Sequence, residues 1–196
     1  PEDRPVVLRC LLWEAGPRAI AVGFPAQVHF AFDAQQVRLA KIWRGAFFNA
    51  GGTWHGRRTS FLQPSGTDVL DLPDGPALAT LATPNTPWPR GTRKGRDTGG
   101  QFRGYDLNQD REPTFRYELD GLSIREHPSP WKASGDKAIR RAFTVQGESS
   151  RGTVYFLAGR GKQIEAGDDG FWNVAGRYRV RLKARPPLLL HVRHVN

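Results

Sequence analysis

The chain has 196 residues, of which 24% are charged and 38% are hydrophobic, and its formal net charge is +10. Eleven Phe, six Trp and four Tyr exclude a disordered chain, because disordered chains are poor in aromatic residues. The length suits one domain spanning 1–196, and no apolar run approaches the roughly 18 residues of a spanning helix.

The charge favours an anionic partner: nucleic acid, anionic lipid, acidic polysaccharide or acidic protein. The cations are dispersed through the chain and the aromatic residues suit a core, so we expect no nucleic-acid binding. Cys10 is the single cysteine, which excludes an internal disulfide and a CxxCH haem-attachment motif. We expect Cys10 to be a small buried core residue.

The first third of the chain predicts four strands. Residues 5–13 form a nearly continuous apolar run, which predicts burial on both faces. The next three runs cover 18–24, 27–33 and 37–43. In the third strand, Val28, Phe30 and Phe32 face one way, so we expect a half-buried strand. A helix over 34–43 is the alternative for the fourth run, but its β-branched and aromatic content favours a strand.

From 49 to 100 the periodic pattern is lost. Gly, Pro, Thr and Asp dominate this segment, with scattered apolar anchors at Leu70, Leu72 and Leu78. We expect a long irregular insertion, and such segments in compact domains are usually functional.

A hairpin follows, with strands 101–107 and 113–119 joined by 108–112. Asp120-Gly121 predicts a tight turn into a third strand over 122–127, which the Pro-containing run 127–131 should end. Four further strand candidates follow: 138–147, 152–159, 176–184 and 188–195.

About ten short strands separated by turn residues predict an all-β fold, an antiparallel β-sandwich of jelly-roll-like form. In the run 176–184, Tyr178, Val180 and Leu182 should face inward. The cations on the opposite face are Arg177, Arg179, Arg181 and Lys183. Such a basic stripe requires a solvated outer face, which an antiparallel sandwich provides.

One Gly-flanked loop carries the sharpest cluster of functional side chains: Trp54, His55, Arg57 and Arg58. Together they offer ring stacking and forked hydrogen bonds to a sugar, an acidic group or a haem propionate. The alternative is that Trp54 packs on the sheet and the arginines are solvated. No metal-ligand spacing and no recognisable catalytic motif is present, so we predict neither a bound metal nor an enzyme.

Three segments carry a family resemblance: GPRAIAVGFP (16–25), FDAQQVRLAKIWRGAFFNAGGTWHGR (32–57) and GGQFRGYDLNQDREPTFRYELDG (99–121). They resemble a β-rich domain of secreted bacterial proteins. Similar domains there accompany c-type cytochrome modules and sugar-dehydrogenase-like propellers of the sorbosone dehydrogenase type. The resemblance implies a periplasmic or otherwise extracytoplasmic setting near electron-transfer proteins. Because this chain lacks the haem-attachment motif, any haem is expected on a partner, with no cofactor bound here.

These observations lead to a non-catalytic accessory or docking subunit of a membrane-associated, cytochrome-linked electron-transfer assembly. Its basic face would bind an acidic protein partner, with a c-type cytochrome as one candidate. The alternative is a carbohydrate-binding module that serves a linked sugar oxidoreductase. In that alternative, exposed rings of Trp54, Trp88 and Tyr105 would stack on a saccharide. A hydrolase or isomerase with His55 as base is a third and weaker hypothesis.

Overall fold

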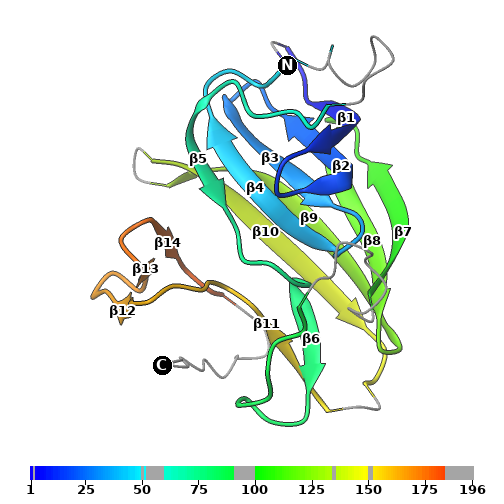
Figure 1. Cartoon of the computed structure of the whole chain (residues 1–196), viewed down its shortest axis with the longest axis vertical. Coiled ribbons are helices and arrows are strands. Elements are labelled where there is room, and N and C mark those ends of the chain that lie inside the picture. The colour runs from blue at the N-terminus through cyan, green and yellow to red at the C-terminus, as the bar shows by residue number, and fades with distance from the viewer. Residues whose placement is uncertain are drawn as a thin grey trace.

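Two antiparallel sheets packed face to face form the body of the chain (Figure 1). The computed structural model describes residues 1, 3–49, 51, 60–90, 100–133, 136–149 and 152–183. The first sheet has the order β1 (Val6–Leu12), β2 (Gly16–Gly23), β3 (Val28–Asp33), β4 (Arg38–Arg44) and β5 (Thr67–Asp71). The second has the order β10 (Asp136–Gln146), β9 (Leu122–Ala133), β8 (Pro113–Leu119) and β7 (Gly100–Leu107).

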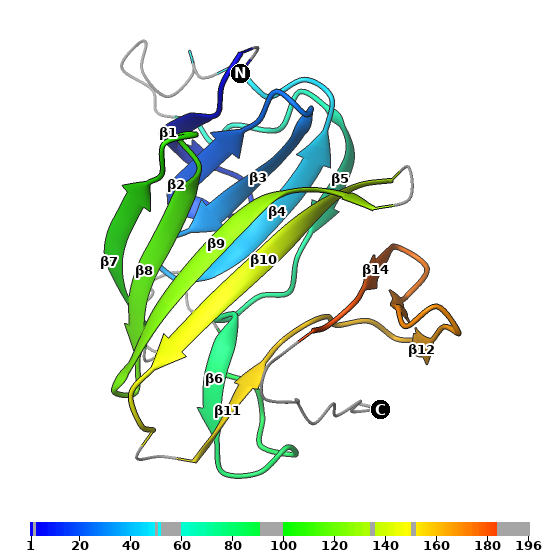
Figure 2. The same cartoon turned by 180° about the vertical axis from the view of Figure 1, so that it is seen from behind.

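Two smaller antiparallel sheets complete the described fold (Figure 2). One pairs β6 (Leu78–Leu81) with β11 (Thr153–Phe156), and the other joins β12 (Ile164–Ala166), β13 (Trp172–Val174) and β14 (Tyr178–Val180). The all-β antiparallel sandwich is therefore confirmed. Within each large sheet the strands follow chain order, so each layer is a meander. In the described part of the chain, no helix has the length and apolarity to cross a membrane.

The core lies between the two large sheets. Phe32 of β3 stacks on Phe115 of β8, with ring centroids 4.1 Å apart and planes 4° apart. Tyr117 and Ile124 extend the cluster along the second sheet, and Phe30 extends it along the first. All five side chains are buried, which follows from the period-2 placement of large apolar residues on one face of each strand.

The other face of the first sheet is also covered, which corrects the expectation of a half-buried strand at 27–33. All six residues of β3 are buried. Trp43, Phe47 and Leu62 contribute to a second apolar cluster on that face, together with Ala31 of β3. On that face, Ala31 is small enough for close packing, and the ring of His29 lies against Trp43 and Phe47, with centroids 5.6 Å and 5.2 Å away.

Two expectations for the first strands have different outcomes. The four strands themselves are confirmed, including β4 in place of a helix. Burial of the first strand on both faces is wrong, because Arg9 is exposed and only Cys10 and Leu12 of β1 are fully buried. Cys10 is buried as expected, and burial raises the pKa of its thiol to about 11.

The segment 49–100 is less irregular than expected. β5 completes the first sheet by pairing with β4, and β6 pairs with β11 from a distant part of the chain. Leu78 is buried and Leu72 packs against the core, so both act as the predicted anchors. β5 was not predicted because its residues are largely exposed and it lacks an apolar face.

The meander is confirmed, but its third strand does not end at 127–131. A tight turn with positive φ at Asp120 and Gly121 leads from β8 into β9. β9 then continues through Pro128 and Pro130, where it pairs with β10. Its pairing with β8 ends at Glu126. A proline fits a strand when its missing N–H faces an unpaired edge, so the long hairpin can extend beyond β8. The predicted strand 188–195 lies outside the described residues.

A buried guanidinium fixes the segment that leaves the first sheet. Arg38 is 3% exposed and donates to the carbonyls of Glu14, Leu72 and Pro73 at 2.7–3.1 Å. It also donates to Asp74 Oδ1 at 2.9 Å. Its Nε lies 3.9 Å from Asp33 Oδ2. Nearby, the buried Lys41 donates to Asp71 Oδ1.

We expect Phe115→Ala to lower the free energy of unfolding by roughly 3–5 kcal/mol, because it leaves a cavity opposite Phe32. Val69→Ala, at a 39% exposed position on β5, should change it by less than about 0.5 kcal/mol. Equilibrium urea unfolding measures both values. Similar losses for the two variants would contradict the described core.

A second prediction concerns pH. Burial raises the pKa of Asp33, although the N–H of Gln35 and the charge of Arg38 act in the opposite direction. Above the unfolded aspartate pKa of about 3.9 and up to the higher folded pKa, the folded chain binds more protons than the unfolded chain. Stability from this group is therefore lost as the pH rises through that interval.

The Asp33→Asn variant isolates this contribution, since an amide oxygen can still accept from Gln35. The free energy of unfolding of the unsubstituted chain, minus that of Asp33→Asn, should decrease as the pH rises above about 4. Asp3→Asn, at an exposed position, is the control. A difference that increases with pH would contradict the assignment.

Candidate functional site

The small sheet β12–β14 carries the predicted basic stripe. Only 178–180 of the expected strand 176–184 form β14, but the alternation continues on both sides of it. Tyr178, Val180 and Leu182 are half-buried, as predicted. The four cations, Arg177, Arg179, Arg181 and Lys183, are exposed.

Two of these cations stack on one aromatic ring. The guanidinium carbons of Arg179 and Arg181 lie 4.8 Å and 4.7 Å from the ring centroid of Phe171. Arg179 also donates to Asp169 Oδ2 at 2.9 Å. Asp169 is held by the predicted turn at 167–170, where its Oδ1 accepts from the backbone N–H of Phe171 at 3.1 Å. The ring and the turn thus limit the freedom of the arginine side chains.

We call Arg179, Arg181 and Lys183 the basic strip. Arg181 and Lys183 form no ion pair with any residue that the structure describes. Each exposed cation–aromatic contact is worth about 0.5–1 kcal/mol. The strip therefore presents cations that are partly ordered before any partner arrives.

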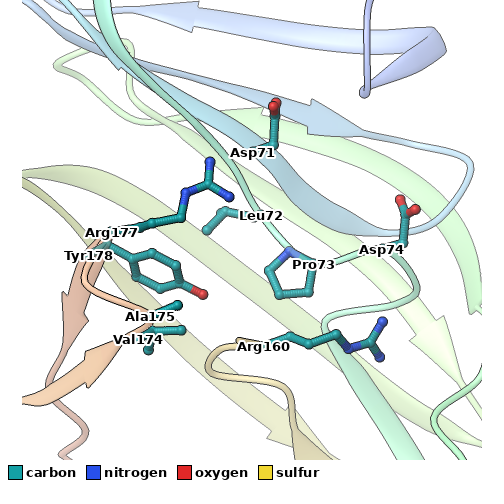
Figure 3. Close-up of a pocket in the computed structure, with 9 residues that line it drawn as sticks. All are labelled: Asp71, Leu72, Pro73, Asp74, Arg160, Val174, Ala175, Arg177 and Tyr178. Carbon is teal, nitrogen blue, oxygen red and sulfur yellow. The ribbon is translucent and has the colours of Figure 1, made fainter. Parts of the chain in front are cut away.

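Arg177 does not belong to this strip. It lies in the β13–β14 connection, where its backbone N–H donates to Val174 O at 3.0 Å. Its side chain lines a pocket beside the segment 71–74, together with Arg160 and Tyr178 (Figure 3). The predicted set of four cations is thus divided between a surface and a pocket.

Trp88 and Tyr105 do not form the exposed stacking surface expected for a saccharide. Trp88 is half-buried, and its indole N–H donates to Pro76 O at 3.1 Å. Tyr105 is half-buried on β7, with its ring centroid 6.0 Å from that of Phe115. Trp54, His55, Arg57 and Arg58 lie outside the described residues.

Sequence reasoning missed two polar features. Glu126 is fully buried and accepts from Tyr117 Oη at 3.0 Å and from Arg141 Nε at 2.7 Å. Burial, together with the charge of Glu126, raises the pKa of Tyr117 well above its usual value. The second feature is the pair Arg160 and Tyr178, which only the fold brings together.

The buried polar group of Glu126, Tyr117 and Arg141 supports packing. Arg141 lies over the rings of Phe143 and Phe156, at 5.1 Å and 5.2 Å from their centroids. It thereby joins the second sheet to β11. Among the described residues, no group of three or more His, Cys, Asp or Glu side chains is arranged to hold a metal ion.

Residues 30–126 match the family described as a domain of unknown function (DUF6797), a span that runs from β3 into β9. No curated protein and no solved structure matches the chain. The matched span contains Arg38, Asp71 and Asp74, and it ends before the sheet that carries the basic strip.

Proposed function

We propose that this chain is a non-catalytic docking domain that binds an acidic protein partner through the basic strip. The observation that carries the proposal is the stacking of Arg179 and Arg181 on Phe171, next to the exposed Lys183. Side chains ordered in advance lose less conformational entropy on binding, which increases affinity.

Charge supports the same conclusion. The segment 160–183 contains six Lys and Arg residues against three Asp and Glu residues, within a chain of net charge +10. A surface of this sign accelerates association with acidic partners and disfavours basic ones.

The setting of the domain is the second part of the proposal, and it rests on the sequence resemblance. We place the chain in an extracytoplasmic, membrane-associated electron-transfer assembly, in which the partner carries the haem. An acidic c-type cytochrome is then a suitable partner, since redox proteins commonly form small, transient interfaces.

The test measures binding of an acidic c-type cytochrome by biolayer interferometry over a series of salt concentrations. Affinity should fall steeply as salt rises, because charges farther apart than about 10 Å are largely screened at 0.1 M. Arg181→Glu with Lys183→Glu should weaken binding at low salt by at least about tenfold, or about 1.4 kcal/mol.

The matched control is Arg9→Glu with Arg18→Glu, which makes the same change in net charge at exposed positions of β1 and β2. It should retain most of the affinity. A basic cytochrome should bind neither the unsubstituted chain nor the control variant. Equal losses in the two double variants, or binding that salt does not affect, would contradict a specific role for the strip.

A further inference from the structure

A pocket of about 190 Å³ lies where the β5–β6 connection meets the β13–β14 hairpin (Figure 3). One wall is formed by residues 71–74. The other wall is formed by Arg160, Val174, Ala175, Arg177 and Tyr178. The volume suits a molecule of a few non-hydrogen atoms. The pocket shares only Arg177 with the predicted basic stripe.

The two carboxylates on the first wall already have cationic partners on β4. Asp71 accepts from the buried Lys41, and Asp74 accepts from the buried Arg38. Figure 3 shows both carboxylates directed away from the Tyr178 side of the pocket. These two acids are therefore structural partners of β4, and they leave the cations of the opposite wall available.

Two guanidiniums remain without a counter-ion. Arg160 and Arg177 are exposed and form no ion pair with a residue in the described part of the chain. Figure 3 shows them on opposite sides of Pro73.

The hydroxyl of Tyr178, a third polar group of the lining, is buried. Tyr178 Oη is inaccessible to solvent and has no hydrogen-bond partner in the described structure. Burial raises the pKa of Tyr178, while the backbone N–H of Arg160 acts in the opposite direction. Because its oxygen is inaccessible to solvent, this hydroxyl is a structural part of the pocket wall and not a ligand contact.

The remaining lining is apolar. Leu72 and Pro73 on one wall face Val174 and Ala175 on the other. The pocket thus combines two forked cationic donors with a short hydrophobic surface. Guanidiniums bind carboxylates by paired hydrogen bonds, and the apolar walls suit a short hydrocarbon chain.

We propose that this pocket binds a small organic carboxylate with a short apolar body, held by the guanidiniums of Arg160 and Arg177. The ligand class follows from donors without acceptors, set beside apolar walls that inorganic anions would leave unused. This inference does not rest on the proposed docking function.

The probe is butyrate, titrated into the ¹⁵N-labelled full chain and followed by NMR. Backbone amides of 160 and 174–178 should shift and saturate, with a Kd on the order of 1 mM for a ligand of this size. Butyramide, which has the same shape without the charge, and inorganic phosphate, which lacks the apolar body, should each bind at least about tenfold more weakly.

Two variants assign the contacts, and the spectra report whether each is folded. Arg160→Gln and Arg177→Gln should each weaken butyrate binding by about tenfold or more. Arg181→Gln, a neighbouring cation outside the pocket, should bind butyrate like the unsubstituted chain. Equal binding of butyrate and butyramide, phosphate binding as tight as butyrate, or an equal loss in Arg181→Gln would overturn the proposal.

A competition measurement separates a free ligand from a carboxylate side chain of a docked protein. Saturating sodium butyrate should affect cytochrome binding no more than sodium chloride at the same ionic strength, because Arg181 and Lys183 lie outside the pocket. If butyrate weakens binding more than sodium chloride does, the pocket takes the partner's carboxylate and the assignment of a free ligand is overturned.

Discussion

The buried guanidinium of Arg38 determines how the outer parts of this chain attach to the sandwich. It joins the carbonyls of Glu14, Leu72 and Pro73 to the carboxylate of Asp74. A charge buried to this extent is tolerated only with several hydrogen-bonding partners. The segment that leads from β5 to β6 is therefore held in one path, and that path forms a wall of the pocket.

Other polar groups in the interior also have structural roles. His29 is buried, and its Nδ1 accepts from the backbone N–H of Phe24 at 3.1 Å. Its Nε2 donates to Gly45 O at 2.8 Å, which defines a neutral ring. Because both nitrogens are engaged with backbone, this imidazole stabilises the turn after β4. Glu126 has a similar role between Tyr117 and Arg141.

The two proposed binding regions use the same kind of side chain in different ways. On the basic strip, arginines stack on an exposed ring, where electrostatics mainly accelerates encounter and selects the sign of a partner's charge. In the pocket, Arg160 and Arg177 lie beside apolar walls, where hydrogen-bond geometry selects the ligand. The hairpin β13–β14 contributes to both regions.

The sequence by itself determined the all-β class, the hairpin of β7 and β8, and the alternation around β14. These features depend on local periodicity and turn residues, such as Asp120-Gly121, which act within a few positions of one another. It also determined the exposure of Arg179, Arg181 and Lys183, because alternate residues of a strand face opposite sides.

Only the tertiary structure decided the burial of both faces of β3, the pairing of β6 with β11, and the position of Arg177 opposite Asp71 and Asp74. Each of these depends on segments far apart in the chain. β6 and β11 lie about seventy residues apart, for example, and no local pattern specifies their register. The pocket around Tyr178 could not be predicted for the same reason: its two walls come from separate segments, and their contact is set by packing and by the buried charge of Arg38.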